Sequence, residues 1–277
     1  MSWCALDVRS PPESRDTVAA WLVSRTGQAV EERGDGMLVT FAESEAEAGS
    51  LLGELQLAFG AAVAGISRPL PDVDWSRQWR DGLGPRIIGR LTVTPSWAVP
   101  GDAGPITVIM DPETAFGTGE HGSTRIALTL LDRYLEPGHR VLDLGSGSGI
   151  LAIAAAKLGA ARATGIELDP EVEPIATANL VRNGVQDRVT CLTGDAAALA
   201  PLLAPVDLIV SNILRTVNET LLPVIRNALA AGGIAIFSGM ERPERPVFLA
   251  ALAGAGFAVV DEATDGEWWG VSARAAG

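Results

Sequence analysis

The chain has 277 residues, of which 47% are hydrophobic, so it is long enough for about two domains and apolar enough to fill a core in each. This composition excludes a disordered or fibrous protein. The 21 basic and 34 acidic residues give a net charge of −13, which repels phosphate backbones, and we expect no direct nucleic-acid binding. No apolar run approaches the ~20 residues that span a bilayer, and the start lacks a signal-peptide pattern, so we expect a cytoplasmic protein without a membrane partner. The cysteines Cys4 and Cys191 lack the spacing of a metal site, and we expect no metal.

The first 68 residues follow the order strand, helix, strand, strand, helix, strand. The apolar patterns place these elements, in chain order, at 3–8, around 18–22, and at 29–33, 37–41, 43–59 and 63–67. Gly34-Asp35-Gly36 predicts a tight turn between the two central strands. Residues 1–68 are therefore expected to form a small ferredoxin-like α+β domain. Up to residue 70 the chain carries ten acidic residues against five arginines, a balance that suits a basic partner and equally suits a solvated surface.

A connector is expected over residues 69–100. Pro69 and Pro71 mark its start. It contains Trp75 and Trp79, which share one face of a helix at this spacing and are expected to pack the connector onto one of the domains.

Residues 101–277 are expected to form a second domain of alternating strands and helices, after a first strand at 106–110. The five expected strands of its main sheet lie at 140–144, 163–167, 189–192, 206–210 and 233–238. This alternation predicts an α/β domain with a parallel, doubly wound, Rossmann-like sheet. Two further strands, 257–263 and 268–273, are separated only by a short turn and should form an antiparallel hairpin at one edge, which completes seven strands.

The most informative segment is a glycine-rich turn between a strand and a helix, Asp143-Leu144-Gly145-Ser146-Gly147-Ser148-Gly149. Glycines allow backbone N–H groups to approach a ligand without an intervening Cβ. A dinucleotide fingerprint would need Gly or Ala where Ile150 stands, and a P-loop would need Gly-Lys-Ser/Thr at its end. A hydrolase nucleophile elbow would need Ser in place of Gly147. The spacing therefore disfavours all three.

A ligand that contains adenosine but no pyrophosphate fits the remaining pattern. Glu167 follows Gly145 by 22 residues, at the tip of the next strand, where a carboxylate can bind both ribose hydroxyls. Asp143 adds a carboxylate for an amino-acid ammonium, so the site suits S-adenosylmethionine, with Gly145 and Gly147 lending backbone contacts. Asp195 is a candidate for the adenine edge, although an ordinary turn Asp is an alternative. A plain helix cap in a catalytically silent domain is the alternative for the whole turn.

Asn212 directly follows the strand 206–210, in Ser211-Asn212-Ile213-Leu214. The strands before Gly145 and before Asn212 are expected to be neighbours at the switch point of the sheet, where ligands bind. The Asn212 side-chain oxygen can then hold one N–H of an incoming amine, and the adjacent backbone carbonyl a second. This arrangement predicts N-methylation with Asn212 as the catalytic residue, although Asn is also common in turns after strands.

Amine methylation requires an uncharged nitrogen. A lysine with a pKa of ~10.4 loses its proton at pH 7 at a cost of roughly 4.6 kcal/mol, whereas an α-amine with a pKa near 7.7 costs only about 1 kcal/mol. Burial beside apolar groups and a positive sulfonium lowers the amine pKa, and alignment supplies the rest of the rate. The chemistry therefore needs neither a catalytic triad nor a metal.

The segment 111–124 carries three glycines in a loop able to fold over a ligand, and we expect Phe116 to contact the cofactor there. Ser123 and Thr124 are expected to cap the following helix, whose N-terminus suits a carboxylate. His121 is expected to fix the loop by hydrogen bonding rather than to act as a base.

Together these features resemble the PrmA-type methyltransferases, class I S-adenosylmethionine-dependent enzymes that modify the eleventh protein of the large ribosomal subunit. The resemblance covers nearly the whole chain. Besides the small first domain, it rests on Asp74-Trp75 and Trp79, the loop 115–119, His121, the turn 143–149, and Asn212-Ile213-Leu214.

The resemblance implies that Thr124, Gly145, Glu167 and Asn212 contact S-adenosylmethionine. It also implies that the first domain carries the protein substrate and that the products are methylated lysine side chains and a methylated N-terminal α-amine. The family usually has Pro-Thr-Thr after the loop histidine, whereas this chain has Gly122-Ser123-Thr124, which keeps the hydroxyls but loosens the backbone. Two alternatives stay open, a methyltransferase for a small-molecule amine and a regulatory module that binds adenosine without transferring methyl groups.

Overall fold

A computed structural model describes residues 3–33, 36–70, 83–101, 104, 106–111 and 119–275. The chain divides into two compact units, Met1–Gly82 and Leu83–Gly277. Trp75 and Trp79, expected to pack the connector onto a domain, lie outside the described residues. No helix among the described ranges is long and apolar enough to cross a membrane.

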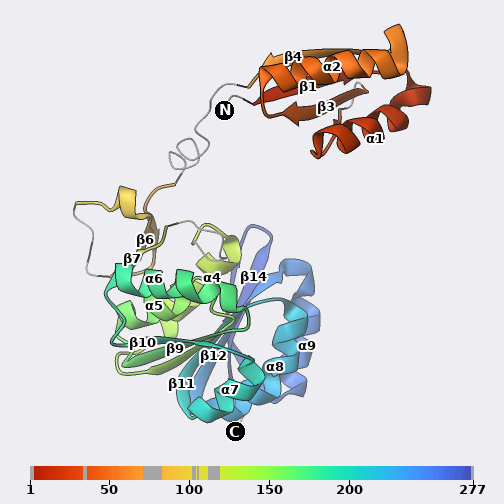
Figure 1. Cartoon of the computed structure of the whole chain (residues 1–277). Coiled ribbons are helices and arrows are strands. Elements are labelled where there is room, and N and C mark those ends of the chain that lie inside the picture. Colours follow the sequence, from red (N-terminus) through yellow and green to blue (C-terminus); the bar gives the residue numbers. More distant parts are fainter. Residues whose placement is uncertain are drawn as a thin grey trace. The chain divides into compact units, whose positions relative to one another are not determined.

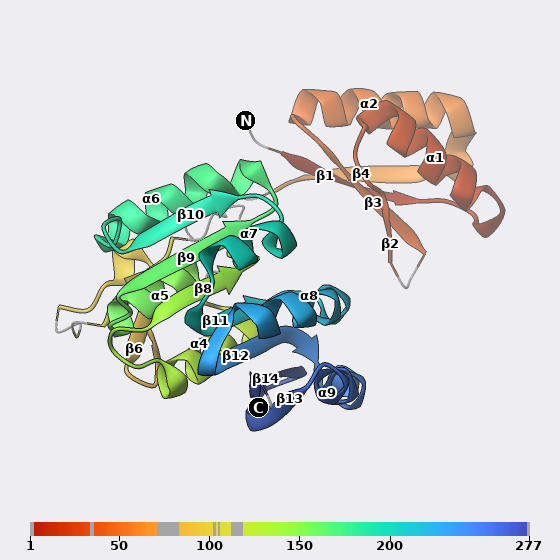
Figure 2. The same ribbon diagram turned by 90° about the horizontal axis from the view of Figure 1, so that it is seen from below.

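The first unit is a four-stranded antiparallel sheet with two helices on one face (Figures 1 and 2). Its strand order is β2-β3-β1-β4, which is the order of a ferredoxin-like fold built from two split βαβ halves, and the expectation for residues 1–68 is confirmed in fold. In chain order the elements are β1 (Cys4–Arg9), α1 (Arg15–Thr26), β2 (Glu31–Glu32), β3 (Met37–Ala42), α2 (Glu45–Phe59) and β4 (Ala64–Pro69).

Local signals define helices α1 and α2. Helix α1 ends at Gly27, which adopts a left-handed conformation with φ of 66°, as a C-terminal glycine allows. Helix α2 starts after Ser44, whose side chain accepts a hydrogen bond from the Glu47 N–H at 3.2 Å. The apolar faces of the two helices meet the sheet in a small core that includes Val8, Val18, Leu22, Leu38 and Leu55.

The second unit contains a seven-stranded sheet with helices on both faces (Figure 1). Its order is β10-β9-β8-β11-β12-β14-β13, and β14 pairs antiparallel with both β12 and β13, whereas the other pairings are parallel. This confirms the doubly wound α/β sheet with an antiparallel edge hairpin. The strands are β8 (Arg140–Leu144), β9 (Arg162–Glu167), β10 (Val189–Thr193), β11 (Val206–Asn212), β12 (Leu229–Glu241), β13 (Phe257–Asp265) and β14 (Trp268–Ala275).

Six α-helices in the described part of this unit cover the two faces of the sheet as separate layers. Helices α4, α5 and α6 pack on one face, and α7, α8 and α9 pack on the other, each layer with its own apolar core. The helices are α4 (Gly122–Tyr134), α5 (Ile150–Leu158), α6 (Glu173–Asn183), α7 (Ala196–Leu203), α8 (Arg215–Ala228) and α9 (Arg245–Gly254). Residues on the sheet alternate between these two cores, for example Val141 and Leu142 of β8, because successive side chains of a strand point to opposite faces.

A small second sheet of three strands lies in the segment expected to be part connector. Strands β5 (Arg86–Ile88) and β6 (Leu91–Thr94) pair antiparallel, and β6 pairs in parallel with β7 (Thr107–Ile109). Strands β5 and β6 were not predicted from the sequence because both are very short. Asn183 of α6 ties this sheet to the main domain, since its side chain accepts the Ile109 N–H and donates to the Ile109 carbonyl, both at 2.8 Å.

The separate cores of the two units predict independent stability. Leu22→Ala, at a buried site in the first unit, should destabilise that unit by about 2–5 kcal/mol and leave the second unit unchanged. Hydrogen exchange followed by mass spectrometry checks this, because amides of β1 and β3 should lose protection while those of β8 and β11 keep theirs.

Leu130→Ala in α4 is the matched control, since Leu130 is as buried in the second unit as Leu22 is in the first. It should give the reverse pattern. Loss of protection across both units in either variant would show that they unfold as one.

Candidate functional site

The candidate site lies where the carboxyl ends of three parallel strands meet. Strand β8 lies between β9 and β11, and the register pairs Leu144 with Ile166 on one side and with Ser211 on the other. The chain from β8 leads toward β9, whereas β11 belongs to the other half of the sheet, so β8 and β11 form the switch point. The strand order thus brings Gly145 and Asn212 close together, as expected.

The glycine-rich turn is hydrogen-bonded to β9 and packs against Ile213, the residue after Asn212. The N–H groups of Gly145 and Ser146 donate to the Ile166 carbonyl at 2.8 and 3.1 Å. Gly145 has φ of 72°, and a Cβ there would collide with the Ile213 side chain. The turn therefore requires glycine for its backbone conformation and for its contact with the chain after β11.

Glu167 is held rigidly at the end of β9. Its carboxylate accepts three backbone N–H groups, from Gly147 at 2.9 Å, Leu168 at 2.8 Å and Asp169 at 3.1 Å. A carboxylate has about four acceptor sites, so acceptor capacity remains for a ligand. The carboxylate lines the main cavity of the site.

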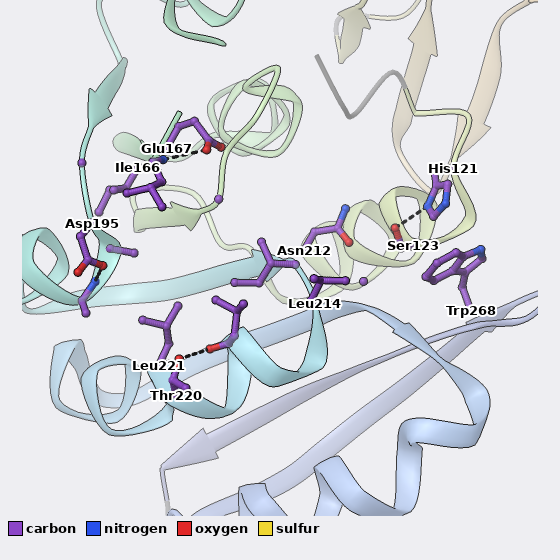
Figure 3. Close-up of a pocket in the computed structure, with 18 residues that line it drawn as sticks. His121, Ser123, Ile166, Glu167, Asp195, Asn212, Leu214, Thr220, Leu221 and Trp268 are labelled. Atoms are coloured by element: carbon purple, nitrogen blue, oxygen red, sulfur yellow. Dashed lines mark hydrogen bonds between the residues drawn. The ribbon is translucent and has the colours of Figure 1, made fainter. Parts of the chain in front are cut away.

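Asp195 lies at the same end of the cavity as Glu167 (Figure 3). It is the N-cap of α7, and its carboxylate accepts the Ala197 N–H at 2.8 Å. The residue thus has the cap role that an Asp before a helix commonly has, and it also faces the cavity.

Asn212 lies in the middle of the cavity wall (Figure 3). Its amide nitrogen donates to the Thr124 hydroxyl at 3.3 Å. Its side-chain oxygen is buried and has no hydrogen-bond donor among the described residues. A buried acceptor without a donor costs about 1–3 kcal/mol, so this oxygen is suited to a donor from a ligand.

Asp143 and Thr124 are fully buried behind the cavity wall and do not line it. One Asp143 oxygen accepts the Ala152 N–H at 3.1 Å, and the other has no donor among the described residues. Burial raises the Asp143 pKa to about 7, the nearby Glu167 charge also raises it, and the Ala152 hydrogen bond acts in the opposite direction.

The far end of the cavity is aromatic (Figure 3). The His121 ring lies 4.3 Å from the Trp268 ring, centroid to centroid, at an interplanar angle of 56°. Gly122 makes this contact possible, because a Cβ there would lie 2.5 Å from Cδ1 of Trp268. Sequence reasoning missed Trp268 as a site residue, since its contact with Gly122 joins segments far apart in the chain.

The prediction that Ser123 and Thr124 cap α4 is wrong. Helix α4 begins at Gly122, so its N-cap position is His121 and no side chain caps it. Ser123 and Thr124 lie inside the first turn, where their hydroxyls have other partners. The Ser123 hydroxyl is hydrogen-bonded to His121 Nδ1 at 2.7 Å, and the Thr124 hydroxyl accepts from Asn212.

The main cavity has a volume of about 730 Å³, and a smaller one of about 230 Å³ adjoins it. Both are lined by Gly145, Glu167, Asn212 and Ile213. Gly147 lines only the smaller one, and Phe116 lies outside the described residues. The volume of the main cavity falls in the range of small-ligand sites.

Comparisons with known proteins agree on one family. The family model described as "Ribosomal protein L11 methyltransferase (PrmA)" matches residues 24–276. A protein of that name from Thermus thermophilus is 42% identical over 220 residues, which cover 78% of this chain and 85% of the relative. One from Aeromonas hydrophila is 32% identical with both chains fully covered. The crystal structure of a ribosomal protein L11 methylase from Lactobacillus delbrueckii subsp. bulgaricus superimposes with a TM-score of 0.62 and 30% identity, covering 70% of this chain and all of that one.

The buried Asp143 predicts a pH-dependent stability. Its folded pKa of about 7 lies above the unfolded value, so the folded chain binds the extra proton and this stabilisation is lost as the pH rises from about 4 through 7. Asn at this position carries no charge at any pH. The unfolding free energy of Asp143→Asn minus that of the unaltered chain should therefore grow by roughly 2 kcal/mol from pH 5 to pH 8.

Urea unfolding at the two pH values measures this difference. Because all other titrating groups are shared, they cancel in the comparison. A difference that stays constant with pH would mean that Asp143 titrates near its ordinary pKa.

Proposed function

The chain belongs to the ribosomal protein L11 methyltransferase (PrmA) family, and we propose that it transfers methyl groups from S-adenosylmethionine to amino groups of ribosomal protein L11. The proposed acceptors are lysine side chains and the N-terminal α-amine. The observation that carries this proposal is the buried side-chain oxygen of Asn212 at the switch point, beside the Gly145 turn, which has no hydrogen-bond donor among the described residues. Modification of a ribosomal protein also suits a cytoplasmic location.

The residues present fit S-adenosylmethionine, which supplies a methyl group on a positively charged sulfur. Glu167 would bind the ribose hydroxyls with its remaining acceptor capacity, and Asp195 would lie at the adenine edge. Gly145 and Gly147 allow a ligand to approach the backbone of the turn. The two adjoining cavities share Gly145 and Glu167, which supports one extended ligand across both.

Three expected cofactor contacts have weaker support. Thr124 and Asp143 are fully buried behind the wall, and Phe116 lies outside the described residues. We propose that Thr124 contributes by fixing the Asn212 amide, with which it shares a hydrogen bond. The unpartnered oxygen of Asp143 stays a candidate partner for the amino-acid ammonium.

Asn212 would orient the acceptor amine. Its side-chain nitrogen is already engaged by Thr124, which fixes the amide so that the oxygen is the free acceptor. An amine N–H donated to this oxygen leaves the nitrogen lone pair to point elsewhere, toward the methyl donor. Positioning of this kind raises the reaction rate, because the bound groups are already aligned for reaction.

The lining of the cavity favours the uncharged amine. Apolar side chains surround the region after Asn212, namely Ile213, Leu214, Val217 and Leu221. Desolvation against such groups lowers the pKa of a buried amine. His121 Nδ1 is engaged by Ser123, which suits a structural role for this ring rather than that of a general base.

We also propose that the first unit carries the protein substrate. Up to residue 70 it has 10 acidic residues and 5 arginines, a balance of −5. This field suits a basic substrate and would steer it toward the enzyme. The described residues that line the cofactor cavity all belong to the second unit, which supports separable binding of substrate and cofactor.

Removal of residues 1–68 should abolish methylation of L11 and leave cofactor binding intact. Intact-mass analysis of L11 after incubation with enzyme and S-adenosylmethionine gives the first measurement, and mass steps of one methyl are expected with the full chain. Calorimetry with S-adenosylmethionine gives the second. Full methylation by the truncated chain would refute the carrier role, and an unchanged L11 mass with the full chain would refute the proposed function.

Asn212→Ala should lower kcat for L11 methylation by about a hundredfold, because the amine loses its alignment. The affinity for S-adenosylmethionine should change far less, since Glu167 and the glycine turn remain. Steady-state kinetics and calorimetry on the same variant separate the two effects. Equal losses in both would make Asn212 a cofactor-binding residue without a role in orienting the amine.

A further inference from the structure

A buried asparagine in α8, the helix that follows Asn212, is hydrogen-bonded to the residue directly after β11. Asn218 lies in α8 and is fully buried. Its side-chain nitrogen donates to the Ile213 carbonyl at 3.1 Å and to the Ser238 carbonyl at 3.3 Å. One amide therefore connects the Ile213–Leu214 peptide, the second peptide after Asn212, with the neighbouring strand β12.

This connection is energetically costly for the fold. The Asn218 side-chain oxygen is buried and has no hydrogen-bond donor among the described residues. An apolar side chain of similar size would bury no unpaired oxygen. Asparagine buries one, but it also donates two hydrogen bonds. Such a local conflict with stability is typical of a residue retained for function.

The same carbonyl is confined from a second side by Gly239. Gly239 has φ of 84°, and a Cβ there would lie 2.5 Å from the Ile213 carbonyl oxygen and 2.8 Å from the Ile213 nitrogen. Strand β12 thus approaches the backbone of Ile213, both its nitrogen and its carbonyl, more closely than any residue with a side chain would allow. The peptides on both sides of Ile213 have little freedom to rotate.

The contacts continue from β12 to the start of α4. The Ser238 hydroxyl donates to the Ser123 carbonyl at 2.8 Å, and the next residue, Thr124, accepts from the Asn212 amide. Asn218 and Asn212 are therefore parts of one buried polar network that joins α8, β11, β12 and α4. Networks of this kind fix a single arrangement when most members are paired.

We propose that Asn218 is a positioning residue for methyl transfer, which holds the Ile213 carbonyl and so fixes the Asn212 amide against the acceptor cavity. It acts through Asn212 and touches neither substrate nor cofactor, since it does not line the cavity. This inference rests on the proposed function of the site. It adds a residue that no sequence motif marks.

Asn218→Ala should lower kcat for L11 methylation roughly 10- to 100-fold, because a shift of about 1 Å in a positioning group has effects of that size. The affinity for S-adenosylmethionine should stay within about twofold, as calorimetry can show. Asn218→Leu, which keeps the branched shape of the side chain and removes the amide donor without burying a charge, should show the same split if the alanine variant folds poorly.

A double-mutant cycle with Asn212 distinguishes positioning from general damage. In the Asn212→Ala background the amide to be positioned is missing, so Asn218→Ala should cost about twofold or less in kcat. A structural defect would lower kcat by the same factor in both backgrounds, and this result would overturn the proposal. So would a single variant with unchanged kcat, or one that loses cofactor affinity as much as kcat.

Asn183→Ala is the matched control. Asn183 is also a buried helical asparagine, and its amide nitrogen donates to the carbonyls of Ile109 at 2.8 Å and Asn179 at 2.9 Å, away from the cavity. It should lose stability with little change in kcat. A comparable kcat loss in this control would overturn the specific role of Asn218. Absence of L11 methylation by the unaltered chain would instead refute the proposed function itself.

Discussion

The site depends on the close packing of the Asn212–Ile213 tip between two glycines. Gly145 leaves room for the Ile213 side chain above the turn after β8, and Gly239 leaves room for the Ile213 backbone beside β12. Both glycines have positive φ, so a larger residue would meet strain as well as collision. Since β8 and β11 are neighbours, this packing brings the turn and the Asn212 amide to one edge of the sheet.

Around this edge the polar side chains fall into two groups. Glu167 and Asp195 accept hydrogen bonds from backbone N–H groups, so their orientations are set before any ligand binds. Asn212 and Asp143 each have a buried oxygen without a donor among the described residues, which costs stability and suits a donor from a ligand. A preorganised site of this kind needs little rearrangement when its ligand binds.

Much of the fold could be predicted because its signals are local. Strand β8 occupies the predicted range Arg140–Leu144, since an apolar run there ends at a glycine turn. Strands β5 and β6 were missed because three or four residues give no periodicity. The contacts of Asn218 and Trp268 likewise depend on the tertiary fold, and Thr124 was expected at a helix cap because sequence shows a hydroxyl but not its partner.

On the proposed function, one cavity would accept amines of very different geometry, a short α-amine and long lysine side chains. Its lining beyond Asn212 is apolar, and apolar surfaces discriminate weakly between such groups. The site can therefore select an uncharged nitrogen but not a particular residue. Selection of the protein then falls to a surface outside the cavity, and a tethered unit that binds the substrate raises the local concentration of every acceptor amine at once. The two-unit organisation thus suits a substrate with several acceptor amines better than a free small amine.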